Sequence, residues 1–347
     1  MKRILAVVLC IVMALSVVAC GEKEAEYKLG MGVVVSTASS KTGNAQVDAT
    51  IAAVVLDAEG KIVSCRIDVA QNKMNVTDGT IEAGKTFNTK MELGKEYGME
   101  GKIDNDGNGV MLEWDAQTKA FEAYVVGKTV AEVEAIKTQE AGGHQIAVDQ
   151  ALLDAGCSMQ ITDFIAAVVK ACKDEQGTSF KAVPGTFTLG VAAKTTVDSS
   201  TKAATAEADG AANMYTDMAC AVVADGKVIA TLNDAIQPKI AINAAGEVTP
   251  AEFKGTKREL KEGYGMAGSE YSPDNNGDGK VLEWYVQSAE FSKFVVGKTA
   301  TEIASLNTKT LENGYVISSD DALLTAGCTI QITGIMAVVS QAANNAR

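Results

Sequence analysis

Residues 47–69 read VDATIAAVVLDAEGKIVSCRIDV, and this stretch decides the fold. On both sides of Asp57–Gly60, apolar side chains alternate with polar or small ones. A period of two is typical of a strand with one buried face, and two such runs around an Asp- and Gly-containing turn are typical of a β-hairpin. The stretch therefore predicts two antiparallel strands, and the first is expected to turn these residues to the core: Val47, Ala49, Ile51, Ala53 and Val55.

The chain repeats itself with an offset of about 165–171 residues, which is 160 at the first match. The collinear matches are Leu29-Gly30 with Leu189-Gly190, Asp57–Lys61 with Asp225–Lys227, Thr89–Leu93 with Thr256–Leu260, Tyr97–Met99 with Tyr264–Met266, Leu112–Trp114 with Leu282–Trp284, Val125–Thr129 with Val295–Thr299, and Ala151–Cys157 with Ala322–Cys328. Solenoid repeats have periods of about 20–50 residues, so a period this long indicates two whole domains.

Helical patterns follow the hairpin in each copy. Apolar residues recur at helical spacing over 114–125 and 284–295, and again after Thr162 and Thr333. The segments Thr129-x-x-Glu132 and Thr299-x-x-Glu302 have the spacing of a capping box, which predicts a short helix at each. Strands followed by helices predict an α+β fold, with two tandem copies of an antiparallel sheet covered by helices.

The N-terminus has the pattern of a secretory signal, with Lys2-Arg3, an apolar run over 4–18 and a small residue before Cys20. The run resembles the lipobox of bacterial lipoproteins, in which the bond before the cysteine is cut and the cysteine is lipidated. A transmembrane helix is the alternative, but about 15 apolar residues fall short of the ~20 that span a bilayer. The expected organisation is a signal peptide (1–19), a tether (20–26), a first domain (27–172), a linker (173–184) and a second domain (185–347).

Charge and composition exclude several classes of function. Signal cleavage leaves 29 basic and 44 acidic residues, a formal charge of −15, so nucleic acid and a peripheral membrane patch are poor candidates for partners. The five cysteines left after Cys10 and Cys20 are odd in number and sit in apolar contexts, which favours buried side chains over a disulfide scaffold. With one histidine, His144, and no familiar hydrolase motif, the sequence favours a binding or electron-carrier protein over an enzyme.

The order of three motifs resembles a known family. They are the Asp225-Gly226-Lys227 hairpin, the aromatic helix that ends in Gly127-Lys128 or Gly297-Lys298, and a Gly-containing turn before the last helix. This order resembles the FMN-binding domain of extracytoplasmic subunits of ion-pumping respiratory complexes and of flavinylated surface lipoproteins. The whole chain is also similar to duplicated lipoproteins of anaerobic Gram-positive bacteria, a likeness that implies architecture alone.

The resemblance implies FMN, and the departures of this chain from the family's attachment motif imply that the FMN is held without a covalent bond. The family links the flavin phosphate to a threonine after an acidic and a hydroxyl residue, and these places hold Leu152 and Ala155, or Leu323 and Ala326, here. Backbone N–H groups of the closing turns would meet the phosphate, and two glutamates would lie at the ring edge. The implied residues are Thr89, Glu92, Gly94, Gly156, Cys157 and Ser158 in the first copy and Thr256, Glu259, Gly327, Cys328 and Thr329 in the second. The alternative is that these turns only cap a helix.

Two loops have the spacing of the first half of a calcium loop. Oxygen-bearing side chains stand at positions 1, 3 and 5, with glycine at position 6: Asp104, Asp106 and Asn108 in one loop, Asp274, Asn276 and Asp278 in the other. Position 12 should supply a bidentate glutamate, but Asp115 and Tyr285 stand there. A polar turn without an ion is the alternative.

Two functions follow from the sequence. The first is a membrane-anchored extracytoplasmic lipoprotein whose two FMN-binding-like domains bind flavin non-covalently and transfer electrons. The second is a non-catalytic surface module that binds a solute or a partner and is ordered by calcium.

Overall fold

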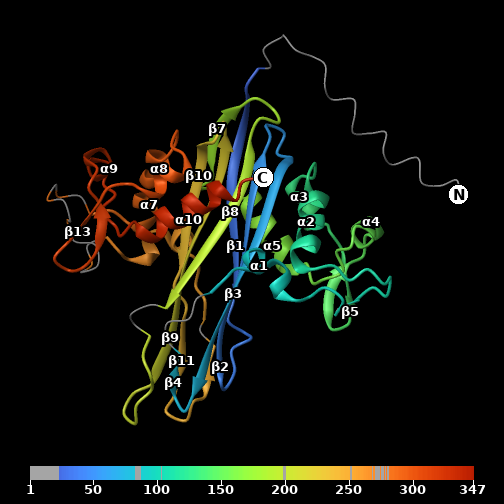
Figure 1. The fold of residues 1–347 in the computed structure, drawn as a ribbon, viewed down its shortest axis with the longest axis horizontal. Coiled ribbons are helices and arrows are strands. Elements are labelled where there is room, and N and C mark those ends of the chain that lie inside the picture. The colour runs from blue at the N-terminus through green and yellow to red at the C-terminus, as the bar shows by residue number, and fades with distance from the viewer. Residues whose placement is uncertain are drawn as a thin grey trace, which may run out of the picture.

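The computed structural model describes residues 23–82, 87–102, 104–197, 201–250, 252–267, 269, 274, 277, 279 and 281–347. These residues form an α+β protein in which two antiparallel sheets pack face to face (Figure 1). Helices cover the outer face of each sheet, so the layers run helix, sheet, sheet, helix (Figure 1).

The described residues of the first half form seven strands. They are β1 (Ala25–Ser36), β2 (Asn44–Leu56), β3 (Ile62–Thr77), β4 (Thr80–Ile81), β5 (Thr138–Ala141), β6 (His144–Ala147) and β7 (Thr178–Ala182). Its helices are α1 (Lys90–Leu93), η1 (Gly94–Tyr97), α2 (Trp114–Val125), α3 (Val130–Glu134), α4 (Gln150–Asp154) and α5 (Thr162–Cys172). The main sheet has the order β4-β3-β2-β1-β7, and β5 and β6 form a separate hairpin.

The second half has a similar order of elements. Its strands are β8 (Thr188–Val197), β9 (Gly210–Ala224), β10 (Lys227–Ile236), β11 (Lys239–Ile242), β12 (Val248–Thr249), β13 (Thr308–Thr310) and β14 (Val316–Ser318). Its helices are α6 (Lys257–Leu260), η2 (Lys261–Tyr264), α7 (Trp284–Phe294), α8 (Ala300–Ala304), α9 (Asp321–Thr325) and α10 (Thr333–Asn344). In the main sheet β9 pairs with β8, β10 and β11.

The hairpin predicted from residues 47–69 is confirmed as β2 and β3, which pair antiparallel with Ile51 opposite Asp68. The expectation of a single buried face is wrong. The alternating set that includes Val47 and Ile51 packs against the second sheet, while Ala52 and Val54 on the opposite face are buried under the helices. The second half covers the face that an isolated domain would leave to solvent.

The segment 173–184, expected as a linker, contributes β7 to the first sheet. Ala182 pairs with Ala25, and Phe180 stacks on Tyr27 with ring centroids 5.6 Å apart. The core between the sheets includes residues of both halves, such as Leu29 and Leu189. The two expected domains therefore share one hydrophobic core and have no extended linker between them.

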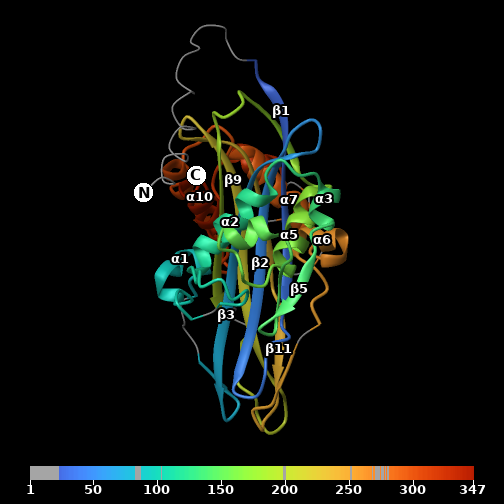
Figure 2. The same cartoon turned by 90° about the vertical axis from the view of Figure 1, so that its right-hand side faces the viewer.

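The long strands give the molecule two distinct ends. The first residue of β1 lies at one end, next to the β2–β3 turn, while the β3–β4 and β11–β12 turns lie at the other (Figures 1 and 2). The last long helix of each half crosses the first strand of the same half at glycine: α5 at Gly30 and Gly32, and α10 at Gly190.

Candidate functional site

The Thr-Lys-x-Glu-Leu segments form the short helices α1 and α6, each begun by a capping box. Thr89 N–H donates to Glu92 at 2.7 Å and Glu92 N–H donates back to the Thr89 hydroxyl at 3.2 Å; Thr256 and Glu259 repeat this pattern. Gly94 ends α1 with a positive φ of 49°. Five of the residues expected at the flavin site therefore cap the short helices: Thr89, Glu92, Gly94, Thr256 and Glu259.

A buried aspartate holds the start of each short helix. Asp68 accepts the Met91 N–H at 3.1 Å, and Asp234 accepts the Arg258 N–H at 3.0 Å. Burial raises the pKa of Asp68 to about 7 and that of Asp234 to about 6, although hydrogen bonds to each carboxylate oppose the shift.

The closing turns are bonded to the long helix of their own half. The N–H groups of Ser158 and Met159 both donate to the Gln117 side-chain oxygen at 3.0 Å, and Thr329 N–H donates to the Gln287 oxygen at 2.8 Å. A phosphate would have to displace these glutamines to reach the donors. Within the described first half, no hydrogen bond joins the turn to α1.

The other residues of the closing turns are buried. Gly156 and Gly327 have φ of 87° and 93°, and a Cβ on either would meet a leucine side chain of the loop before the long helix. Cys157 and Cys328 are fully buried, and burial raises the pKa of each thiol to about 12. The packing of these glycines and cysteines fits the alternative in which the closing turns only cap a helix.

The cation loops are closed by their own hydrogen bonds. Asp104 accepts the Gly109 N–H at 3.0 Å, and Asp274 accepts the Gly279 N–H at 2.7 Å. Asp106 accepts from Asn108 through one oxygen, while its other oxygen is buried with no hydrogen-bond partner in the part of the chain described. Asn276 and Asp278 lie outside the described residues.

The side chains near the end of the first loop point to other partners. Asp115 pairs with Lys119 at 2.7 Å. Burial opposes ionisation of Glu113, but hydrogen bonds from the N–H groups of Trp114, Met99 and Glu100 lower its pKa. Among the described residues, no three His, Cys, Asp or Glu side chains gather as a metal site.

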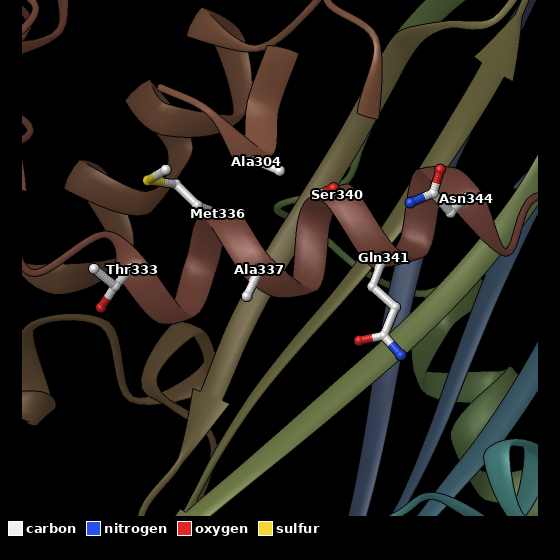
Figure 3. A pocket seen from close by; sticks show the side chains of 7 residues that line it. All are labelled: Ala304, Thr333, Met336, Ala337, Ser340, Gln341 and Asn344. Carbon is white, nitrogen blue, oxygen red and sulfur yellow. The ribbon is translucent and has the colours of Figure 1, made fainter. Parts of the chain in front are cut away.

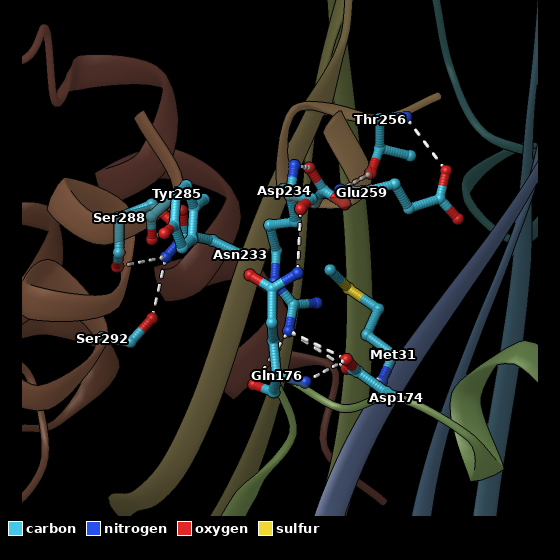
Figure 4. Close-up of polar contacts among 11 residues, drawn as sticks. Met31, Asp174, Gln176, Asn233, Asp234, Thr256, Glu259, Tyr285, Ser288 and Ser292 are labelled. Atoms are coloured by element: carbon cyan, nitrogen blue, oxygen red, sulfur yellow. Dashed lines mark hydrogen bonds and ion pairs between the residues drawn. The ribbon is translucent and has the colours of Figure 1, made fainter. Parts of the chain in front are cut away.

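A cavity of about 350 Å³ lies where the two halves meet, between the end of α5, β1 and α6; we call it the junction pocket. Arg258 of α6 forms its central ion pair, 3.0 Å from Asp174 just beyond α5, and both side chains are only 8 % exposed. Arg258 also donates to the Gln176 carbonyl oxygen, and the Gln176 amide donates back to the Arg258 carbonyl at 2.8 Å (Figure 4).

Charges of both signs surround an apolar floor in the junction pocket. The cationic residues are Lys170, Lys173, Arg258 and Lys261, the acidic ones Asp174, Glu175, Asp234 and Glu259, and the floor is Met31, Val33 and Val169. Lys170 pairs with Glu259 at 2.8 Å, again across the two halves. At the corresponding place on the other side of the molecule, Met91 and Asn345 stand where Arg258 and Asp174 stand here, so the ion pair occurs in one copy only.

The repeated lysine of α1 and α6 lies over aromatic rings. The Lys257 ammonium lies 4.6, 4.7 and 5.3 Å from the ring centroids of Tyr215, Tyr264 and Trp284. Lys90 makes the same contacts with Tyr97 and Trp114. The repeated Lys, Tyr and Trp motifs thus join each short helix to the long helix by cation–π contacts.

A second hollow, of about 420 Å³, lies along α10 (Figure 3). Small and polar side chains line it, among them Ala304, Ala337, Ser340 and Asn344. In the first half the ion pair between Lys173 and Glu134 occupies the corresponding place. This hollow brings no ionisable side chains together.

Comparisons with protein-family models, with curated proteins and with solved structures found no match. No helix in the described part of the chain has the length and apolar character needed to cross a bilayer. Cys20 lies outside the described residues.

The sequence patterns did not predict the junction pocket. One signal for it was present, since Arg258 and Asp174 differ from Met91 and Asn345 at the matching positions of an otherwise similar repeat.

Proposed function

We propose that this chain is a lipid-anchored, extracytoplasmic binding protein without catalytic chemistry, and that its ligand occupies the junction pocket. The observation that carries this proposal is the buried Arg258–Asp174 pair on the wall of a cavity of about 350 Å³. Ligand pockets commonly have volumes of about 300–1,000 Å³ and few, well-placed polar groups. A pocket built by both halves also gives the duplicated chain a role that one copy alone would lack.

The lining favours a small zwitterion such as an α-amino acid. Four cationic and four acidic side chains surround Met31, Val33 and Val169, so a ligand with both charges and a short apolar part finds a partner for each. Charge-assisted hydrogen bonds to such groups are stronger than neutral ones. The existing pairs, Lys170–Glu259 among them, would exchange partners when the ligand enters.

Thermal unfolding with single amino acids tests the binding site. An amino acid that binds only the folded state should raise the melting temperature by mass action. Val169→Trp should fill the pocket and abolish the shift, whereas Val148→Trp, at an exposed position elsewhere, should keep it. If no amino acid at millimolar concentration changes the melting temperature or gives heat in calorimetry, that result would contradict an amino-acid site in the junction pocket.

The anchor needs a separate test. Cys20→Ser should release the protein from the membrane fraction of cells, while Cys10→Ser, inside the signal, should leave it bound. Continued membrane association of Cys20→Ser would contradict lipidation at this residue.

Flavin binding with electron transfer is the second proposal. The order of the motifs supports it, but the Gln117 and Gln287 oxygens already occupy the N–H groups that would hold the phosphate. A visible spectrum of the purified protein after addition of FMN is its direct test.

A further inference from the structure

The end of the molecule at which β1 begins has a charge unlike the rest of the chain. We define this anchored end by six segments, which strand pairing or backbone hydrogen bonds join in pairs: 23–28 with 181–187, 57–63 with 126–132, and 225–228 with 296–302. They carry seven lysines and seven acidic residues, so they are neutral, whereas the mature chain has 29 basic and 44 acidic residues. The acidic surplus therefore lies elsewhere on the molecule.

Hydrogen bonds fix the loops of the anchored end beside the hairpins. Gly127 N–H donates to the Ile62 carbonyl at 2.7 Å, and Ile62 N–H donates to the Lys128 carbonyl at 2.9 Å. In the second half Gly297, Val228 and Lys298 repeat both bonds. The two halves thus present equivalent loops on either side of the first residues of β1.

Apolar side chains are exposed at this end. Among the described residues five large apolar side chains are exposed, and Val63, Val126 and Val296 of the anchored end are three of them, at 37 %, 46 % and 49 %. Val126 and Val296 occupy the same place in the two copies. The anchored end thus combines a neutral charge with three of the five exposed large apolar side chains of the described residues.

The tether limits how far this end can lie from a lipid on Cys20. Four residues lie between Cys20 and Ala25, the first residue of β1, and the five residue-to-residue steps span at most about 18 Å. The opposite end is much farther away, because the 16 residues of β3 alone extend over about 50 Å. That far end consists of loops from both halves, where Ala204 N–H donates to the Gly79 carbonyl.

We infer that the anchored end is a membrane-facing surface that rests on an anionic bilayer, with the strands pointing away from the membrane. The inference rests on the lipid anchor proposed above. Anionic lipid repels the acidic flanks and the far end, while the neutral end meets no such repulsion. The lysines of this end approach the headgroups and its exposed valines enter the interface. The charge of the whole chain argues against a membrane patch, but this sum does not show that the acidic residues are unevenly distributed over the molecule.

Energy transfer from single dyes to a lipid-bound acceptor tests the orientation. The lipidated protein is reconstituted in phosphatidylcholine–phosphatidylglycerol vesicles, with a dye on Val126→Cys, Val296→Cys, Ala206→Cys or Ala245→Cys. The five described native cysteines resist labelling because burial raises the pKa of four thiols and the fifth, Cys172, is half-buried with a pKa of about 11. Transfer from positions 126 and 296 should be equal, and several-fold more efficient than from 206 and 245.

The four positions separate the alternatives. A protein lying on one helical layer would give strong transfer from one of positions 126 and 296 and weak transfer from the other. Equal transfer from all four positions would mean a freely tumbling body, and either result overturns the inference. Failure of the lipidated protein to float with the vesicles would instead contradict the anchor itself.

Discussion

A Cβ atom built on Gly30 would lie 2.0 Å from the carbonyl oxygen of Ala171, because α5 crosses β1 with its backbone almost in contact with the strand. Gly190 has the same relationship to Ala342 in the second half. The repeated Leu-Gly motif therefore marks the position at which a helix backbone packs so closely on the strand that no side chain fits between them.

Gly30→Ala should destabilise the fold strongly. The clash is with backbone, so the strand and helix must separate, and we expect a loss of about 3 kcal/mol or more in the free energy of unfolding. Gly263→Ala is the control, since a Cβ there meets no atom within 4 Å. Urea unfolding measures both; equal stability of the two variants would mean that α5 does not lie on β1 as described.

The Arg258–Asp174 pair should couple the halves energetically. Removing one partner leaves the other charge buried and unpaired, so each alanine variant should lose about 3–5 kcal/mol, and the double variant less than the sum. The control pair is Asp115 and Lys119, whose side chains are 26 % and 51 % exposed and should contribute about 0.5 kcal/mol. Additive losses at 174 and 258 would contradict a direct contact.

The protein should become less stable as pH rises from acidic to neutral. Burial raises the folded-state pKa of Asp68 and Asp217 to about 7 and that of Asp234 to about 6. A raised carboxyl pKa gives stability that is present below the unfolded-state value and lost as pH rises through the folded-state value. The melting temperature should therefore fall from about pH 4 to about pH 7 and level off above that range.

Asp68→Asn should flatten part of this pH dependence, because the amide oxygen still accepts the Met91 N–H but does not titrate. Gln150→Ala, a surface change that removes no titratable group, should leave the slope unchanged. A wild-type melting temperature that is constant or rises over this range would contradict the raised pKa values.

Calcium is expected to bind the first loop weakly. Asp106 has a buried oxygen with no hydrogen-bond partner in the described region, but Asp115 at position 12 is already paired with Lys119. We expect a Kd of about 10⁻⁴–10⁻³ M, and a higher melting temperature at millimolar calcium. Asp104→Ala should remove the shift, and Asp163→Ala, outside the loop, should retain it. Identical melting with and without calcium in the wild type would exclude the site.

Local patterns in the sequence predicted the elements well. The β2–β3 hairpin, the Trp114 and Trp284 helices and the capping boxes at Thr129 and Thr299 are confirmed, since each depends on residues close in sequence. The contacts between the halves were not predictable in this way. Val47 and Leu232 share a core although they are far apart in the chain, and alternation alone did not reveal what covers the second face of β2.

The candidate site shows the same division between local patterns, which the sequence reveals, and contacts between the halves, which it does not. Thr89 and Glu92 are a capping pair that their spacing could have indicated, whereas their assignment to a flavin came from resemblance. The junction pocket depends on Asp174 and Arg258 meeting across the two halves, and no local pattern specifies such a meeting.

The closing turns should bind phosphate only after their glutamines are removed. Gln287→Ala frees the Thr329 N–H that the Gln287 oxygen now accepts, and Gln117→Ala frees those of Ser158 and Met159. Unbonded N–H groups before a helix suit an anion. Inorganic phosphate should therefore raise the melting temperature of these variants and not that of the wild type or of Gln150→Ala, whose side chain contacts Asp154 on the surface.

FMN fluorescence should be unchanged by the wild type at micromolar concentrations. Quenching by the wild type that Gln287→Ala strengthens would place flavin at the turn after all, and would move the electron-carrier proposal ahead of the solute-binding one.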